Sequence, residues 1–296
     1  MVTILDGGMG AELIRRGVAE RTGLWSAKPL IDDPEAVVQA HLDYIAAGAQ
    51  VITTNSYSTI PSYLCKEHFE SRYEELTALS GELARRAVRE SGADVRVAGC
   101  LPPLSESYRA DLVPPDEEAR PVYENLVRAL EPNVDLFLCE TMSSAREARN
   151  AALAARVAGR TRGLPVYVSW TLAETPGGGL RSGESIERAL DAVADLAIDA
   201  YLFNCTTREA IAAGMTTLAG LTDKPFGGYP NRMHVPDAWT LDNEAEVEHH
   251  QELGTQVFVR GALDAFGQGA SLYGGCCGVG PEDIAALAEA VAGAVV

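Results

Sequence analysis

Short apolar runs alternate with amphipathic stretches along the 296 residues of the chain. Most runs are too continuously apolar for half-exposed antiparallel strands, and they are typical of parallel strands covered on both faces. The last two are weaker because they are rich in glycine. The eight runs are Val2–Leu5, Gln50–Thr53, Val95–Ala98, Val134–Cys139, Val166–Thr171, Ala200–Phe203, Pro225–Gly228 and Ser271–Gly274.

The stretches between these runs have helical patterns. Pro34–Ala47 follows two aspartates and ends before Gly48, as helices often do. The other expected helices are Glu70–Glu90, Asp116–Leu130, Ser144–Ala158, Glu184–Leu196, Thr207–Leu218, Asp242–Phe266 with interruptions at Gly254 and Gly261, and Pro281–Val295.

Eight strands alternating with helices predict an α/β protein with a single (β/α)₈ TIM-barrel domain over residues 1–296. An open doubly wound sheet is the alternative, and the count of eight disfavours it. No Gly-x-Gly-x-x-Gly segment opens a helix after a strand, so the sequence does not support dinucleotide binding.

The charge balance excludes several classes of partner. The chain has 24 lysines and arginines against 42 aspartates and glutamates, a formal net charge of −18. Such a surface repels nucleic acids and anionic lipids.

The amino-terminal segment lacks the pattern of a secretory signal, and no apolar segment approaches the roughly 20 residues of a membrane span. We therefore expect a cytoplasmic protein whose six cysteines are thiols or metal ligands. The sequence does not indicate an oligomeric state.

Polar and thiol residues follow most of the expected strands. In a (β/α)₈ barrel these carboxyl-terminal strand ends form the active site, and stability alone would not place such residues there. The segments are Asp6-Gly7-Gly8, Asn55-Ser56-Tyr57, Glu140-Thr141, Asn204-Cys205, Tyr229-Pro230-Asn231 and Gly275-Cys276-Cys277-Gly278.

Three of the cysteines form a candidate metal site. Cys205, Cys276 and Cys277 lie beside glycine or asparagine at the ends of the sixth and eighth strands. Adjacent strand residues point to opposite faces, so the cysteine pair can address one metal only if the flanking glycines let the backbone turn. Three thiolates suit Zn²⁺ and leave its fourth position open, as in catalytic sites. The pattern alone also fits a redox pair, inert buried thiols or a vicinal disulfide.

The other three cysteines are expected to have no role in this chemistry. Cys100 and Cys139 end the third and fourth strands, and Cys65 lies in a connecting region. Free cysteine commonly packs as a small apolar residue, and we expect this of all three.

A set of longer motifs occurs in order along nearly the whole chain. They are LDGGMGAELIRRG at 5–17, LWSA at 24–27, PEAVVQAHLDYIAAGAQVITTNSY at 34–57, VAGCLPPLSESYRADL at 97–112, ET at 140–141, FNC at 203–205, YPN at 229–231 and GGCCGVGPEDI at 274–284. With these motifs the chain resembles the homocysteine S-methyltransferases. That family includes betaine- and S-methylmethionine-dependent enzymes and the homocysteine module of cobalamin-dependent methionine synthase.

The resemblance implies a (β/α)₈ barrel with a zinc site made by the three cysteines at 205, 276 and 277. It also implies that Asp6 and Glu140 hold the amino group of homocysteine, while the backbone around Gly7 and Gly8 meets its carboxylate. Two carboxylates facing one ammonium, with glycines that allow close backbone approach, suit an amino acid zwitterion.

Four further residues match motif positions. Trp25 and Tyr57 correspond to residues that line the methyl-donor side in betaine-dependent relatives, and an aromatic wall attracts an onium group through cation–π contacts. Asn204 and Asn231 receive only shaping or hydrogen-bonding roles.

The resulting hypothesis is direct displacement, in which a substrate thiol binds zinc as fourth ligand, loses its proton and attacks a donor methyl group. S-methylmethionine, S-adenosylmethionine and betaine-like compounds are the candidate donors, with a sulfonium favoured, and methionine is the product. No histidine lies among the strand-end residues, and this chemistry requires no general base. The alternatives are another thiol or selenol acceptor, a corrinoid-protein donor, or a non-catalytic zinc- or amino-acid-binding barrel.

Overall fold

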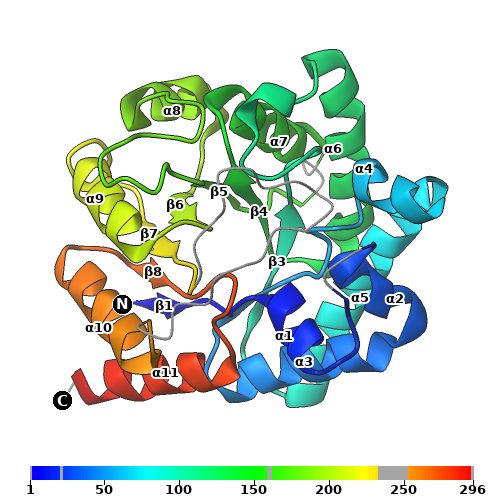
Figure 1. Ribbon diagram of the computed structural model, residues 1–296, viewed down its shortest axis with the longest axis horizontal. Coiled ribbons are helices and arrows are strands. Elements are labelled where there is room, and N and C mark those ends of the chain that lie inside the picture. The colour runs from blue at the N-terminus through cyan, green and yellow to red at the C-terminus, as the bar shows by residue number, and fades with distance from the viewer. Residues whose placement is uncertain (1, 21–22, 159–161, 233–252, 295–296) are drawn as a thin grey trace.

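Eight parallel strands form one sheet at the centre of the molecule, surrounded by helices (Figure 1). The computed structural model describes residues 2–20, 23–158, 162–232 and 253–294. The strands follow the order β1-β8-β7-β6-β5-β4-β3-β2. Their bounds are β1 Thr3–Ile4, β2 Val51–Thr53, β3 Arg96–Leu101, β4 Leu136–Met142, β5 Val166–Trp170, β6 Ala200–Asn204, β7 Phe226–Tyr229 and β8 Leu272–Tyr273.

The seam between β1 and β2 closes the sheet into a barrel. Leu5 pairs in parallel with Val51, the Gln50 N–H donates to the Ile4 carbonyl at 2.8 Å, and the Asp6 N–H donates to the Val51 carbonyl at 3.0 Å. The predicted (β/α)₈ fold class is therefore confirmed.

Helices follow each strand along the chain. Side-chain caps begin several of them: Asp33 accepts from the Ala36 N–H before α3, and Thr207 accepts from the Ala210 N–H before α9. The α-helices are α1 Met9–Arg15, α2 Lys28–Asp32, α3 Pro34–Ala46, α4 Pro61–Leu64, α5 Tyr73–Ser91, α6 Asp116–Leu130, α7 Ala145–Ala158, α8 Ile186–Val193, α9 Arg208–Ala219, α10 Thr255–Gly267 and α11 Pro281–Ala294. None of the described helices is long and apolar enough to cross a membrane.

The expected interruption at Gly261 is wrong. Gly261 lies inside the continuous helix α10, and Gly254 is the residue that precedes its first turn. A Cβ atom at Gly261 would lie 2.7 Å from the Arg208 side chain. The glycine thus permits close packing of α10 against the start of α9 rather than breaking the helix. The expected helical residues 242–252 lie outside the described residues.

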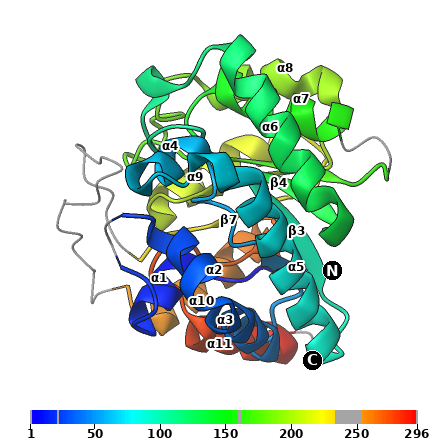
Figure 2. The same cartoon turned by 90° about the vertical axis from the view of Figure 1, so that its right-hand side faces the viewer.

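Apolar side chains form two separate cores. Alternate residues of a strand point to opposite faces, so in β4 Leu136 and Leu138 fill the barrel interior while Phe137 and Cys139 pack against the helices. The side view shows this outer layer, with α3 and α11 adjacent (Figure 2). Glu140 continues the inward series, and the interior core therefore supports polar groups at the carboxyl ends of the strands.

Candidate active site

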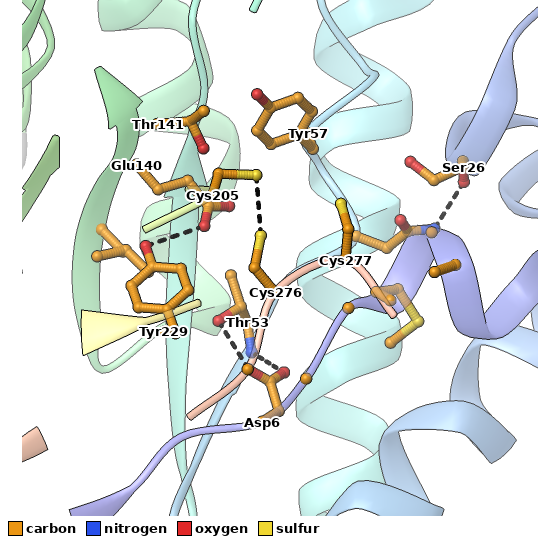
Figure 3. A pocket seen from close by; sticks show the side chains of 18 of the residues that line it. Asp6, Ser26, Thr53, Tyr57, Glu140, Thr141, Cys205, Tyr229, Cys276 and Cys277 are labelled. Atoms are coloured by element: carbon orange, nitrogen blue, oxygen red, sulfur yellow. Dashed lines mark hydrogen bonds between the residues drawn. The ribbon is translucent and has the colours of Figure 1, made fainter. Parts of the chain in front are cut away.

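A cavity of about 430 Å³ opens at the carboxyl ends of the strands. Nine of the eleven site residues predicted from the sequence line it, and several of them are drawn in Figure 3. The two that do not are Asn204 and Asn231. The nine are Asp6, Gly7, Gly8, Trp25, Tyr57, Glu140, Cys205, Cys276 and Cys277.

The thiols of Cys205, Cys276 and Cys277 converge at one side of this cavity, although 71 residues separate the first from the second (Figure 3). Their three Sγ atoms all lie within 4.8 Å of one another, and those of Cys205 and Cys276 are 3.0 Å apart. Zn–S bonds of about 2.3 Å in a tetrahedron place sulfur atoms roughly 3.8 Å apart. The cluster can therefore hold a metal ion if the closest pair widens by less than about 1 Å.

Backbone turns aim these thiols at a common point. Cys205 has a left-handed φ of +56° directly after β6, and Gly278 has a φ of +83° after the cysteine pair. The Cys276 N–H donates to the Pro230 carbonyl at 3.0 Å, and the Cys277 N–H donates to Asn231 Oδ1 at 3.2 Å. The loop after β7 thus fixes the loop after β8.

Without a bound cation, only one of the three cysteines readily loses its proton. Hydrogen bonds from the Cys205 and Cys276 thiols lower the pKa of Cys277 well below its usual value. The same contacts, together with burial, raise the pKa of Cys276 well above its usual value. Holding three thiolates at once therefore calls for a cation, which agrees with a metal site.

Two glycines let the loop after β8 lie directly against the loop after β1. A Cβ atom at Gly7 would lie 2.3 Å from the Val279 carbonyl oxygen, and one at Gly8 would lie 2.6 Å from the Cys276 carbonyl oxygen. The Val279 carbonyl also accepts hydrogen bonds from the Gly8 N–H at 3.1 Å and from the Tyr44 hydroxyl at 3.0 Å. The Gly8 N–H is therefore occupied, whereas the Gly7 N–H has no acceptor among the described residues.

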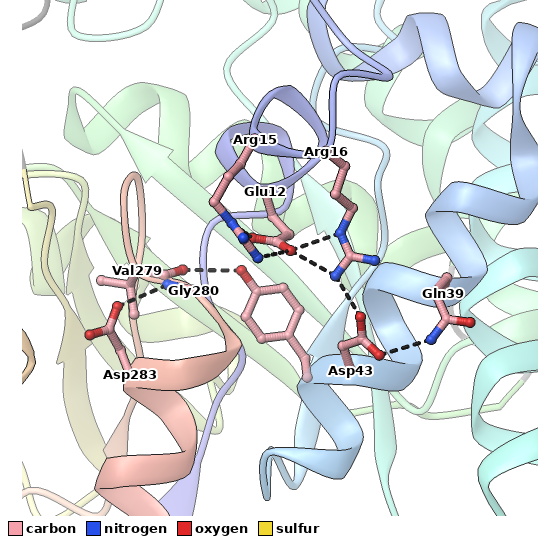
Figure 4. Close-up of polar contacts among 9 residues, drawn as sticks. Glu12, Arg15, Arg16, Gln39, Asp43, Val279, Gly280 and Asp283 are labelled. Carbon is pink, nitrogen blue, oxygen red and sulfur yellow. Dashed lines mark hydrogen bonds and ion pairs between the residues drawn. The ribbon is translucent and has the colours of Figure 1, made fainter.

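An ionic cluster orients the first helix beside these glycines (Figure 4). Glu12 on α1 is buried, and its carboxylate binds Arg15 and Arg16, each at 2.7 Å. Arg16 also reaches Asp43 on α3 at 2.6 Å. The cluster joins α1 to α3, so the segment from Asp6 to Gly8 has a fixed course into the cavity.

Asp6 and Glu140 place two buried carboxylates in the cavity. Asp6 accepts hydrogen bonds from the Thr53 N–H at 2.7 Å and the Thr53 hydroxyl at 3.2 Å, and Glu140 accepts from the Tyr229 hydroxyl at 3.2 Å. Burial raises the pKa of Asp6 to about 8 and that of Glu140 to about 7. Neither has an ion-pair partner within the described ranges. This arrangement suits a cationic ligand, whose charge would restore both carboxylates to the ionised form.

The three remaining cysteines differ from one another. Cys139 is buried in the outer core, as expected. Cys100 is also buried, and its thiol lowers the pKa of the Glu140 carboxyl group, against the larger opposite effect of burial. The expectation for Cys65 is wrong, because this residue is exposed and its thiol donates to the Ser62 carbonyl.

Trp25 and Tyr57 form an aromatic wall of the cavity. Their ring centroids are 5.9 Å apart and the ring planes meet at 87°. A Cβ atom at Gly10 would lie 2.5 Å from the Trp25 indole, so this glycine makes room for the ring. The Tyr57 hydroxyl lies 2.7 Å from Ser107 Oγ, which fixes the ring orientation.

Asn204 and Asn231 hold backbone at the cavity instead of facing it. Asn204 Oδ1 accepts from the Thr141 N–H at 2.9 Å, and Asn204 Nδ2 donates to the Thr141 hydroxyl at 2.8 Å. Asn231 holds the N–H of Cys277, as described above. The shaping or hydrogen-bonding roles expected for both residues in the reaction stay predictions.

The sequence analysis assigned no role to several cavity residues, among them Thr53, Tyr108 and Tyr229.

Backbone strain is concentrated around the cavity. Six non-glycine residues of the described chain have positive φ, and four of them line the cavity: Trp25, Tyr108, Thr141 and Cys205. Such conformations cost about 1–3 kcal/mol each and concentrate at functional sites. Tyr108 lies in the motif at 97–112, but nothing in that motif indicates which residue it contacts.

Comparison with known proteins identifies the family. The family model described as homocysteine S-methyltransferase matches residues 3–291. The chain belongs to this family of methyltransferases. It is 33% identical to the homocysteine S-methyltransferase of Escherichia coli K12, over 97% of this chain and 94% of that protein. The selenocysteine Se-methyltransferase of Brassica oleracea var. italica is 28% identical over 96% of this chain and 87% of its own.

Solved structures of a family member have the same fold. The metallated form of the homocysteine methyltransferase MmuM from Escherichia coli superimposes with a TM-score of 0.80 at 29% identity, covering 97% of this chain and 96% of that one. Its apo form has a TM-score of 0.74 at 26% identity. The cavity with its three thiols is therefore the candidate active site of this homocysteine S-methyltransferase.

Proposed function

We propose that this protein transfers a methyl group from a small onium donor to the sulfur of homocysteine, with a zinc ion held by Cys205, Cys276 and Cys277. Family membership supports the methyl transfer and the acceptor. The convergence of three thiols in a cavity that also contains two uncompensated carboxylates is the observation that carries the proposal.

The acceptor would bind through both of its charged groups. Burial favours the protonated forms of Asp6 and Glu140. The positive charge of the ammonium would favour their ionised forms instead, so the two carboxylates would bind it as its counter-charges. The carboxylate of the acceptor can accept from the N–H of Gly7. The Gly8 N–H cannot contribute, because it already donates to Val279.

The donor set fits zinc on chemical grounds. Thiolates are soft ligands that favour this ion, and three of them leave one position for a substrate. When bound, zinc would lower the pKa of a thiol at that position and keep it ionised at neutral pH. The chain contributes the geometry: the turns at Cys205 and Gly278 orient the ligands, and Asn231 and Pro230 hold the cysteine pair.

The donor would occupy the side of the cavity bounded by Trp25 and Tyr57. An onium cation gains roughly 0.5–2 kcal/mol from each well-placed aromatic face. A sulfonium such as S-methylmethionine or S-adenosylmethionine is favoured over betaine, because a thioether leaves more readily than a tertiary amine. Displacement needs the two reactants in line, and the cavity walls supply that alignment.

The test begins with metal content. The purified protein should carry close to one zinc per chain, and Cys205→Ser, Cys276→Ser and Cys277→Ser should each lose it. The exposed Cys65→Ser is the matched control and should keep its zinc. Full zinc content in one of the three variants would remove that cysteine from the ligand set.

A donor panel with homocysteine, read by mass spectrometry for methionine, then tests the reaction. Turnover with a sulfonium and without a corrinoid supports the donor assignment. Methylation only in the presence of a methylcobalamin-loaded partner protein would contradict it. Selenocysteine belongs in the same panel as a second acceptor, because one of the full-length relatives carries the name of a selenocysteine methyltransferase.

A further inference from the structure

Tyr108 contacts one of the three clustered thiols directly. Its hydroxyl oxygen lies 3.0 Å from Cys205 Sγ, and its ring lines the cavity. Tyr108 lies between β3 and the short helix Ala110–Leu112, and its backbone has a left-handed φ of +69°. A non-glycine residue in this region is strained, so the surrounding structure must hold it there.

Arg181 is one of the groups that hold Tyr108. Its guanidinium carbon lies 5.2 Å from the centroid of the Tyr108 ring, within cation–π range. The Arg181 side chain is 13% exposed, and its nearest carboxylate, that of Glu174, is 3.9 Å away. Its Nε atom is buried without a hydrogen-bond partner in the described structure. The tyrosine ring is therefore a principal neighbour of this partly buried cation.

The direction of the hydrogen bond follows from the chemistry of the cluster. Three thiolates around a divalent cation would leave one net negative charge on the partly buried cluster. A thiolate can only accept a hydrogen bond, so the Tyr108 hydroxyl must be the donor to Cys205. The positive charge of Arg181 over the ring withdraws electron density from the phenol and strengthens it as a donor.

We propose that Tyr108, supported by Arg181, is a positioning residue that donates a hydrogen bond to the Cys205 thiolate and thereby sets the electron density and metal affinity of the three-cysteine site. The inference rests on the proposed metal site and adds to it a residue that lies outside the ligand set. Partners of this kind typically alter metal affinity by roughly 10- to 100-fold.

The test uses the full-length protein loaded with Co²⁺, whose sulfur-to-metal charge-transfer absorption reports on the thiolates. Tyr108→Phe keeps the ring and removes only the donor, so the sulfur lone pairs rise in energy and the band should move to longer wavelength. Competition with a chelator at fixed pH should show metal binding weakened by roughly 10-fold or more. Arg181→Gln should move the band in the same direction by a smaller amount.

Tyr123→Phe is the matched control. Tyr123 is a buried tyrosine whose hydroxyl donates to the Pro102 carbonyl and which does not line the cavity. This variant should keep the wild-type band and affinity. A wild-type band and affinity in Tyr108→Phe would overturn the proposal, and a wild-type band in Arg181→Gln would overturn the role of Arg181. If the wild-type protein itself showed no thiolate charge-transfer band, the failure would lie with the three-cysteine metal site.

Discussion

Variants of Asp6 and Glu140 can test acceptor binding separately from metal binding. The two carboxylates should act on the ammonium of the acceptor, so Asp6→Asn and Glu140→Gln should raise the homocysteine KM while zinc content stays at the wild-type level. Losing a charged hydrogen-bond partner in a buried site costs about 1.5–3 kcal/mol, or roughly 10- to 100-fold. Steady-state kinetics and metal analysis of the same preparations check this. Unchanged homocysteine kinetics in both variants would contradict the assignment.

Trp25 provides the corresponding test on the donor side. Trp25→Ala removes an aromatic face and should raise the donor KM by roughly 3- to 30-fold, the range expected for one cation–π contact. Homocysteine binding, followed by calorimetry without donor, should stay the same because Asp6 and Glu140 are intact. Tyr57→Phe keeps its ring and should affect donor use less than Trp25→Ala. Equal loss of homocysteine and donor binding in Trp25→Ala would instead indicate collapse of the cavity wall.

At the scale of elements, β4 and β6 are joined at their carboxyl ends by Asn204. Its side chain binds both the N–H and the hydroxyl of Thr141, which has a strained φ of +61° directly after Glu140. Asn204→Ala leaves this buried N–H without its acceptor and should lower the free energy of unfolding by about 1–3 kcal/mol. Homocysteine affinity should fall as well, because Glu140 loses its fixed position.

Urea unfolding and calorimetry of Asn204→Ala measure these two effects. Asn125→Ala on α6 is a suitable comparison, because its side chain hydrogen-bonds to Tyr73 and Glu74 on α5 and does not line the cavity. This variant should lose some stability but keep the wild-type homocysteine affinity. An Asn204→Ala protein with wild-type stability would show that the Thr141 conformation does not depend on this side chain.

The elements themselves were largely predictable from the sequence, for a physical reason. Strands such as Ala200–Asn204 are buried on both faces and read as unbroken apolar runs, and helices such as Asp116–Leu130 have regular apolar spacing. The interruption predicted at Gly261 was wrong because it rested on helix propensity, which is a local quantity. Glycine is required there by close packing against Arg208 in another helix.

At the scale of the whole molecule, barrel closure explains which part of the site the sequence could indicate. The carboxyl ends of all eight strands meet at one rim, so the order of strands along the chain is enough to place the motif residues there together. The supporting contacts could not be predicted in this way, because they depend on loop conformation. The Tyr108 contact with Cys205 needs a left-handed backbone, and the Gly8 contact with Cys276 needs two loops at van der Waals distance.

The buried carboxylates should also make the stability of the whole protein depend on pH. Burial raises the pKa of Asp6 from 3.8 to about 8 and that of Glu140 from 4.5 to about 7. Between about pH 5 and 8 the folded state therefore binds more protons at these sites than the unfolded state. The free energy of unfolding should decrease as pH rises through this window, by at most about 1.4 kcal/mol per pH unit for each group.

Urea unfolding of the zinc-loaded protein at several pH values from 5 to 8 measures this dependence, and the Asp6→Asn/Glu140→Gln double variant isolates it. Two other buried groups with shifted pKa values are the same in both proteins. Burial raises the pKa of Glu147 to about 7. Burial lowers the pKa of His41 to about 3, so this residue makes the free energy of unfolding increase with pH below about pH 6.5. The difference between the two proteins should therefore reflect Asp6 and Glu140 alone, with the variant gaining relative stability as pH rises. Saturating homocysteine should reduce that difference, because its ammonium favours both carboxylates in the ionised form. Equal slopes for the two proteins would mean that neither carboxyl group carries a raised pKa in the folded state.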